Sequence, residues 1–295
     1  MKSYFLYIAH YAIFFESAGS GIDLVPSARF ANFICPETIP DLTIVVHRGP
    51  FRVPDKAARV FHAPLIEEKD DRLVKTGENF WSVYYGEPDV YIRSLFPYSA
   101  SCGEAVVHLT PSSRRWDLYL PEDNTITDPF EYPLDGLILY YLTAISGDVF
   151  IHASGVYHDG QGYLFSGISG KGKTTMACLW EKAGGTVIHD DRLIIRKISG
   201  SYRMFNTPVY NNDTPKESVL SSVFLIEHGE KNKISRLKES SAVSNILANC
   251  IQQNWNHEFI RRLMDSLSDM CGSIPVYHLY FRPDLSITNF LTKNE

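Results

Sequence analysis

Residues 167–175 read GISGKGKTT and match the pattern GxxxxGK[S/T]. In such a loop, glycines let successive backbone N–H groups face an anion without a Cβ in the way, and the helix that follows favours negative charge at its N-terminus. Lys173 would add a positive charge at the β- and γ-phosphates, and the Thr174 hydroxyl would bind Mg²⁺. The pattern therefore predicts a loop that binds a nucleoside triphosphate, with ATP as the expected ligand. The residues expected to contact the nucleotide are Gly167, Ser169, Gly170, Lys171, Gly172, Lys173, Thr174 and Thr175.

The segments on either side of this loop supply the context that the pattern requires, a strand before it and a helix after it. The apolar run 163–165 is typical of a strand, and 174–183 carries apolar residues at helical spacing. Gly184 and Gly185 are expected to end that helix. A chance match in a chain of this length occurs roughly once in a hundred. A glycine-rich turn with an accidental lysine is therefore the alternative that the context disfavours.

Two carboxylates, Asp190 and Asp191, follow a short strand expected at 186–189. In a parallel sheet this strand would end at the same edge as the strand before the loop. One carboxylate could then hold Mg²⁺ and the other accept a hydroxyl proton. The alternative is a surface turn, where aspartate is common. His152, at the end of a strand expected at 149–152, would lie near the transferred phosphate or be an ordinary hydrogen-bonded histidine.

The second half of the chain alternates between strand and helix patterns, which indicates an α/β domain with some antiparallel pairing. Asp128 and Pro129 predict the start of a helix whose apolar face falls within 134–142 and which ends at Gly147. Further strands are expected at 149–152, 163–165, 186–189, 193–198, 202–205, 223–226 and 276–281, and the pair around residues 199–201 is expected to form a hairpin.

The first half of the chain is β-rich. Short runs of β-branched and aromatic residues, separated by polar or glycine/proline turns, predict strands at 42–47, 80–85, 90–95, 105–109 and 116–120. Residues 1–15 are expected to form an opening strand rather than a signal peptide, because a histidine and aromatic residues interrupt the apolar run. We therefore expect a β-rich domain of unknown role at 1–127 and a catalytic-type domain at 128–295.

Composition excludes several function classes. The chain has 295 residues, 44% of them hydrophobic, and a net charge of −6, so it lacks the basic excess of nucleic-acid binders. Its five cysteines show no CxxC spacing, which argues against a disulfide framework or a structural zinc site. No apolar run reaches the roughly 20 residues that span a bilayer. The expectation is a soluble, cytoplasmic protein without a nucleic-acid or membrane partner.

Several motifs in the second half occur in a fixed order that resembles a known family. They are IHASGV at 151–156, GYLFSG at 162–167, SGKGKTT at 169–175, GG at 184–185 and DDR at 190–192. In this order they resemble the catalytic domain of bacterial HPr kinase/phosphorylase and its HPr-kinase-like relatives, whose phosphate-loop fold is shared with phosphoenolpyruvate carboxykinase. The resemblance covers roughly residues 149–283 and implies an HPr-kinase/carboxykinase-like P-loop domain with a mixed sheet.

The resemblance also implies roles for individual residues. Asp190 would be the base for an acceptor hydroxyl, Asp191 would lie on the side of the Mg²⁺ ion that the pattern assigns to Thr174, and His152 would lie near the transferred phosphate, which the pattern places at Lys173. It further implies serine as the acceptor. Relatives of this kind phosphorylate serine in ribosomally made precursor peptides and are often oligomeric, so a homo-oligomer is left open.

Two features depart from the family pattern. HPr kinases carry acidic residues where this chain has Ile168 and Thr175, and the glycine-rich segment tied to the reverse, phosphorolytic reaction is replaced by TPVYNN at 207–212. HPr as substrate and the phosphorylase activity are therefore not carried over from the resemblance.

The leading hypothesis is an ATP- and Mg²⁺-dependent kinase that phosphorylates a hydroxyl, expected to be serine in a peptide or small protein. Two alternatives remain open. One is a nucleotide-binding regulatory module without transfer activity. The other is carboxykinase-like chemistry on a small carboxylic acid, which would need an arginine-rich pocket; the candidate residues are Arg192, Arg196, Arg203 and Arg282.

Overall fold

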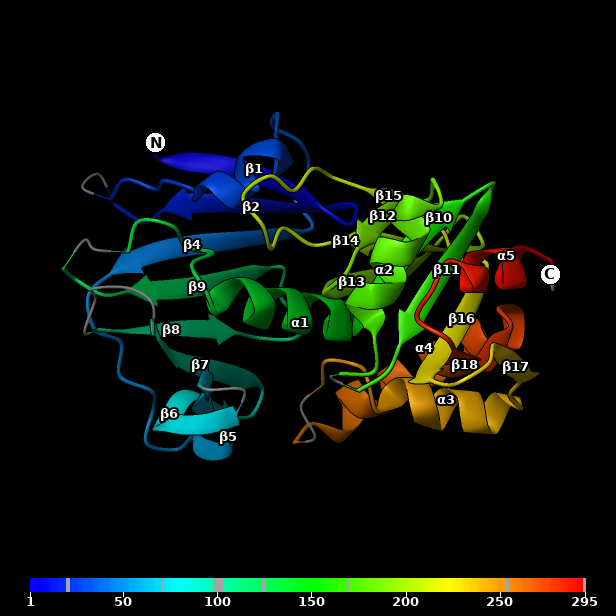
Figure 1. Ribbon diagram of the computed structural model, residues 1–295. Helices are drawn as coiled ribbons and strands as arrows, with labels where there is room; N and C mark the ends of the chain where they lie inside the picture. The colour runs from blue at the N-terminus through cyan, green and yellow to red at the C-terminus, as the bar shows by residue number, and fades with distance from the viewer. Residues whose placement is uncertain are drawn as a thin grey trace. The chain divides into compact units, whose positions relative to one another are not determined.

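The computed structural model describes residues 1–19, 22–69, 72–97, 103–123, 126–168, 170–252 and 255–293. The protein is a mixed α/β chain with few helices, and it divides into two compact units, residues 1–139 and 140–295 (Figure 1). Within the described residues, each unit is built on a mixed sheet of nine strands. No helix in these ranges is long and apolar enough to cross a bilayer.

Unit 1 is organised around a sheet with strand order β3-β1-β2-β4-β9-β8-β7-β6-β5. Its elements are β1 (Ser3–Ile8), β2 (Tyr11–Ser17), η1 (Ala28–Phe33), β3 (Ile34–Cys35), β4 (Leu42–Arg48), β5 (Ala58–Lys69), β6 (Arg72–Gly86), β7 (Asp89–Leu95), β8 (Glu104–Leu109) and β9 (Arg115–Leu120). The five strands expected here are confirmed as β4 and β6 to β9. The opening segment forms a hairpin of two strands, β1 and β2, rather than one.

The segment before the first α-helix differs from the prediction. The Asp128 carboxylate accepts the N–H groups of Phe130, at 2.8 Å, and Ser27, at 3.0 Å, so it stabilises a turn and a contact with an earlier segment. Helix α1 (Leu134–Ser146) begins only after Pro133. Proline disfavours helical geometry in the residue before it, which explains why the helix cannot run back to Asp128. The expected end at Gly147, with φ of +75°, is confirmed.

Unit 2 is organised around a sheet with strand order β15-β14-β13-β10-β11-β16-β18-β17, and β12 also pairs with β10. Its strands are β10 (Val149–His158), β11 (Gln161–Ser166), β12 (Thr186–His189), β13 (Arg192–Ile198), β14 (Ser201–Asn206), β15 (Glu217–Val219), β16 (Ser222–His228), β17 (Lys233–Arg236) and β18 (Val276–Phe281). Its further helices are α2 (Lys173–Lys182), α3 (Glu239–Leu247), α4 (His257–Ser273) and α5 (Ser286–Lys293).

Strand direction in unit 2 brings the loop and the acidic pair to one edge of the sheet. Strands β11, β16 and β18 are parallel, whereas β10 is antiparallel to β11, β12 and β13. Because β11 and β12 both run opposite to β10, they run in the same direction. The sheet is therefore mixed rather than parallel, yet the strands before the loop and before the acidic pair still end at the same edge.

Two apolar clusters cover the two faces of this sheet. On one face, Tyr163 and Phe165 pack with Trp180 of α2 and with residues of α5. The Trp180 ring is fully buried and stacks on Tyr163 at 4.9 Å between centroids. On the other face, Leu164 and Leu225 pack with residues of α3 and α4. Truncating a buried aromatic of this size costs about 3–5 kcal/mol, so Trp180 fixes α2, and with it the loop, against the sheet.

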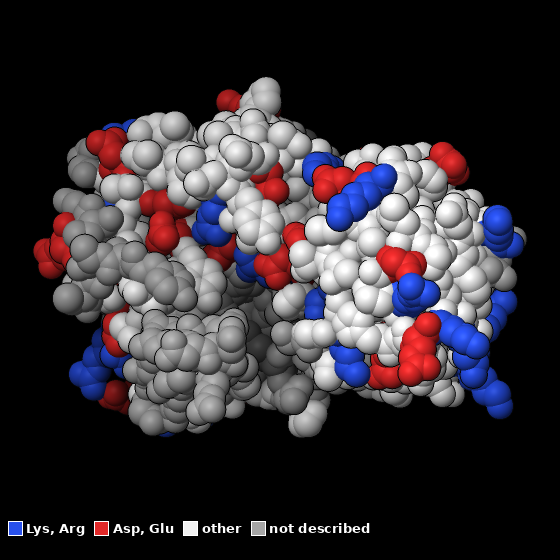
Figure 2. Space-filling model, viewed as in Figure 1, with Lys and Arg blue, Asp and Glu red and all other residues white. Residues whose placement is uncertain are grey.

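Charged side chains of both signs are interspersed on the surface of unit 2. On the face drawn in Figure 2, lysine and arginine lie among aspartate and glutamate over the described part of this unit, at the right of the view.

Candidate functional site

The loop from Gly167 to Gly172 connects the end of β11 to the start of α2, so the expected strand–loop–helix context is confirmed. Gly170 and Gly172 adopt φ of +80° and +94°, a region that residues with a Cβ rarely occupy. A Cβ on Gly172 would lie 2.7 Å from Phe281 Cζ and 2.9 Å from His228 Cε1. Glycine at 172 is thus required both by backbone geometry and by space. Ser169, also expected in the loop, lies outside the described residues.

Lys173 is buried, and its ammonium group points back into the loop. Its Nζ donates to the carbonyl oxygens of Gly167, at 2.8 Å, and Ile168, at 3.3 Å. Burial lowers the pKa of Lys173, and the negative charge of Asp191 partly opposes this shift. A cation held inside a glycine-rich loop at a helix N-terminus suits a polyphosphate, so the residues present fit the expected ligand.

The other loop residues take different positions. Lys171 Nζ lies 3.3 Å from a carboxylate oxygen of Glu227 on β16. Thr174 is exposed and Thr175 is half-buried, both in the first turn of α2. An exposed hydroxyl directly after the buried lysine is compatible with the predicted Mg²⁺ ligand.

The acidic pair forms the short connection between β12 and β13. The Asp191 carbonyl accepts the N–H of Ala153 on β10 at 3.0 Å, which ties this connection to the central strand. Asp191 Oδ1 lies 3.3 Å from His152 Nε2, and Asp191 Oδ2 lies 3.6 Å from Arg192 Nε. The structure therefore brings His152 and Asp191 into contact, and the charges of Lys173 and Asp190 also act on His152.

His152 lies in the middle of β10, not at the end of a strand as predicted. It is the last β10 residue that pairs with β13, and from Gly155 onward β10 pairs with β12, with a register shift between Gly155 and Val156. A Cβ at Gly155 would lie 2.9 Å from Leu193 and Met204, so glycine at this position lets these two side chains pack against β10. A strand that continues through a glycine is not expected from sequence, which explains the early end predicted at residue 152.

The protonation state of His152 follows from its surroundings. Its side chain is 52% exposed. Desolvation of the ring lowers the pKa of His152, Asp191 opposes this shift, and Lys173 and Arg192 lower it further. The imidazole is thus neutral at pH 7, with one nitrogen able to accept a proton or a hydrogen bond.

Three residues that the sequence did not single out support the acidic pair. Burial raises the pKa of Tyr210, and the nearby carboxylates of Asp190 and Asp191 raise it further. The Tyr210 ring stacks on His189 with 5.5 Å between centroids. His189 Nδ1 accepts the N–H of Asp191 at 3.0 Å, and its Nε2 lies 3.5 Å from Asp213. The Asp213 carboxylate in turn accepts the N–H of Tyr210 at 2.7 Å. The only sequence signal near these contacts was segment 207–212, noted above as a departure from the family pattern.

The four arginines expected for carboxykinase-like chemistry are dispersed among different partners. Arg192 lies at the acidic pair, as described above. The others pair with carboxylates elsewhere in unit 2: Arg196 with Asp148 at 2.9 Å, Arg203 with Glu217 at 3.0 Å, and Arg282 with Asp284 at 2.6 Å.

The carboxylates do not form a metal cage by themselves. Across the described ranges, no group of three or more His, Cys, Asp or Glu side chains could hold a metal ion. Magnesium is commonly bound through one or two carboxylates together with substrate phosphates, so Asp191 and Thr174 fit a site that the nucleotide completes.

Comparison with known proteins gives little further information. No family model and no curated protein matches the chain. Among solved structures, the Hpr(Ser) kinase/phosphatase from Coxiella burnetii aligns with 50% of this chain and 99% of its own, at 9% identity and a TM-score of 0.28, which is a weak structural similarity.

Proposed function

We propose that this protein is an ATP- and Mg²⁺-dependent phosphotransferase that transfers the γ-phosphate to a hydroxyl, serine in a peptide or small protein. One observation carries the proposal: the loop with its buried Lys173 and the acidic pair with His152 lie at the same edge of one sheet, and Asp191 is 3.3 Å from His152. Phosphoryl transfer needs a phosphate cradle, a metal-holding acid and a group that orients or deprotonates the acceptor. These three requirements meet here.

The nucleotide supplies the phosphoryl group, and Mg²⁺ offsets the charge on its oxygens. The loop N–H groups and Lys173 bind the phosphates, while Thr174 and Asp191 hold the metal. Neutral His152 donates a hydrogen bond to an oxygen of the terminal phosphate or accepts one from the acceptor hydroxyl.

Asp190 acts as the base. The hydroxyl proton passes to its carboxylate, the acceptor oxygen bonds to the γ-phosphorus, and the bond from that phosphorus to the bridging oxygen breaks. The proximity of Tyr210 to Asp190 supports this assignment, because a neighbouring hydroxyl can hold a base in one orientation to receive the proton. The dispersed arginines disfavour the carboxykinase-like alternative, since a pocket for a small carboxylic acid would need several of them together.

The test is the Asp190→Asn variant in an assay that follows ³²P from [γ-³²P]ATP to mixtures of serine-centred peptides. We expect transfer to fall at least a hundredfold while the Kd for ATP stays within about twofold, because a base acts on the acceptor and not on nucleotide binding. Transfer near the wild-type rate would show that Asp190 is not the base. ATP binding without transfer by the wild-type protein would favour the regulatory module instead.

A further inference from the structure

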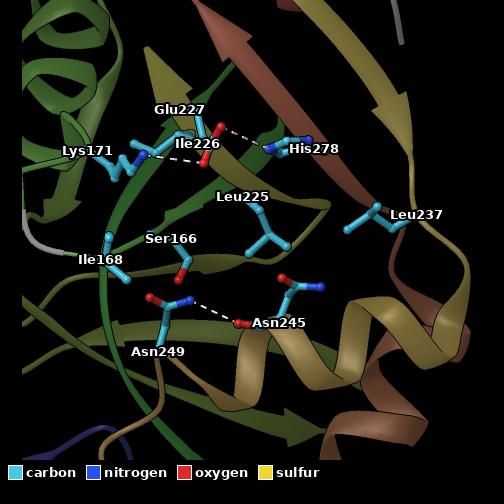
Figure 3. Close-up of a pocket in the computed structure, with 11 residues that line it drawn as sticks. Ser166, Ile168, Lys171, Leu225, Ile226, Glu227, Leu237, Asn245, Asn249 and His278 are labelled. Atoms are coloured by element: carbon cyan, nitrogen blue, oxygen red, sulfur yellow. Dashed lines mark hydrogen bonds and ion pairs between the residues drawn. The ribbon is translucent and has the colours of Figure 1, made fainter.

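A pocket of about 280 Å³ adjoins the loop on the α3 face of the sheet in unit 2 (Figure 3). Its walls include the start of the loop, the ends of β11 and β16, His278 of β18 and the C-terminal end of α3. The volume is enough for one long side chain or a small polar molecule. Of its lining residues, the roles described above use Gly167 and Lys171 of the loop, and not Glu227, Asn245 or Asn249.

The pocket lies at the end of the loop that the terminal phosphates would contact. Gly167 and Ile168 line it, and the carbonyl oxygens of the same two residues accept hydrogen bonds from Lys173 Nζ. The lysine of this motif meets the β- and γ-phosphates. An occupant of the pocket would therefore lie beside the phosphate to be transferred, where the acceptor binds, rather than beside the nucleoside.

The polar lining includes several hydrogen-bond acceptors together with the ammonium group of Lys171. The side-chain amide of Asn245 donates to the Ser241 carbonyl at 2.7 Å, and that of Asn249 donates to the Asn245 carbonyl at 2.9 Å. Each amide thus uses one of its two N–H groups on the helix, and its oxygen can accept a hydrogen bond from another partner. The side chain of Ser166 is fully buried at the pocket wall, and its hydroxyl has no partner among the described residues. A polar group of this kind is ordinarily satisfied, which points to an occupant.

Glu227 is the only carboxylate among the described residues that line the pocket. It lies 3.3 Å from Lys171 and 3.8 Å from His278. The pair with Lys171 joins side chains that are 35% and 40% exposed, and pairs of this kind are weak. A triphosphate in the loop would attract Lys171, because that lysine belongs to the loop itself. Glu227 would then be available to another cation, and the net charge of −6 favours the approach of a basic peptide.

We propose that this pocket receives a lysine or arginine side chain of the acceptor peptide, next to the phosphorylated hydroxyl. The inference rests on the proposed phosphotransfer. Glu227 pairs with the basic group, and the oxygens of Asn245 and Asn249 accept its remaining N–H groups. The Ser166 hydroxyl bonds the innermost donor. The pocket thereby selects acceptor peptides with a basic residue at one fixed position from the acceptor serine.

The experiment uses the full chain with MgATP and serine-centred peptide mixtures in which one flanking position at a time is fixed as Lys, Arg, Gln or Leu. We expect kcat/KM to be roughly tenfold higher when Lys or Arg occupies one position, in keeping with one charge-assisted hydrogen bond. Glu227→Gln, which keeps the shape and removes the charge, should abolish this preference. Glu230→Gln, the same change at an exposed residue three positions later, should retain it.

The outcomes separate the two proposals. Transfer without a basic preference, or with a preference that Glu227→Gln leaves intact, would overturn the pocket assignment and leave the phosphotransfer standing. An ATP Kd raised tenfold or more by Glu227→Gln, but not by Glu230→Gln, would assign the pocket to the nucleotide. That result would also overturn the assignment of the pocket to the acceptor peptide. No transfer to any mixture by the wild-type protein would overturn the proposed function and the pocket assignment with it.

Discussion

His152 on β10 and Asp191, in the connection between β12 and β13, lie 3.3 Å apart from Nε2 to Oδ1 although they are 39 positions apart in the sequence. Strand order explains the contact: β12 and β13 share one edge of β10, and the chain passes from one to the other beside His152. The candidate site therefore depends on the strand order of the sheet as much as on the sequence motifs.

The charges around His152 set the pH at which it titrates. Desolvation and Lys173 lower the pKa of His152, whereas Asp191 raises it. We expect its midpoint, followed by ¹H NMR of the ring, to lie below the ordinary value of 6.5. Asp191→Asn should lower the midpoint further and Lys173→Met should raise it. Shifts of the opposite sign in these two variants would contradict the described electrostatics.

The same lowered pKa affects stability with a definite sign. Between the folded and unfolded pKa values of His152, the unfolded state binds more protons, so the free energy of unfolding falls as pH falls below about 6.5. His152→Gln should lose less stability than the wild type between pH 7 and pH 5 in urea unfolding. Identical losses in the two proteins would show that the His152 ring is not desolvated by the fold.

Lys173 should govern nucleotide binding with little effect on folding. Its Nζ bonds only carbonyl oxygens within its own loop among the contacts described above, and a phosphate would be a stronger, charged partner. We expect Lys173→Met to raise the Kd for ATP by between roughly tenfold and a hundredfold, measured by calorimetry. Lys182→Met, in the last turn of the same helix, serves as the control and should bind normally. Equal ATP affinities for the wild type and both variants would show that Lys173 does not contribute to ATP binding.

Gly172 and Gly200 form a matched pair for testing the loop. Both have φ near +90°, at +94° and +84°, but a Cβ at Gly172 would contact Phe281 at 2.7 Å and one at Gly200 would meet nothing within 4 Å. Gly200→Ala should cost about 1 kcal/mol of unfolding free energy from backbone strain alone. Gly172→Ala should cost about 1–2 kcal/mol more, because the neighbours must shift. Equal losses in urea unfolding would mean that the neighbours accommodate the methyl group.

Tyr210 is expected to position Asp190 rather than to react. Tyr210→Phe removes the hydroxyl near Asp190 and keeps the ring that stacks on His189. We expect kcat for transfer to fall about tenfold with an unchanged Kd for ATP and unchanged thermal stability. Tyr157→Phe, at a half-exposed ring on β10, is the control. If Tyr210→Phe lowers thermal stability enough to account for the whole fall in kcat, Tyr210 has a structural role only.

Local patterns predicted the parts of the site that are contiguous in sequence. The loop, its flanking strand and helix, and the strand before Asp190 all rest on spacing within fewer than twenty residues, and the structure confirms these elements. The contacts of Tyr210, Asp213 and Glu227 could not be predicted, because they depend on how β14, β16 and the loops between them return to the same edge. Strand β5 was missed since Pro64 and several charged residues obscure its alternation.

The most direct test of the central proposal is the fate of the γ-phosphate in the wild-type protein. With [γ-³²P]ATP, Mg²⁺ and serine-centred peptide mixtures, we expect label on peptide serine, and none when Lys173→Met replaces the wild type. ATP that binds in a Lys173-dependent manner while its label stays on the nucleotide would contradict phosphotransfer.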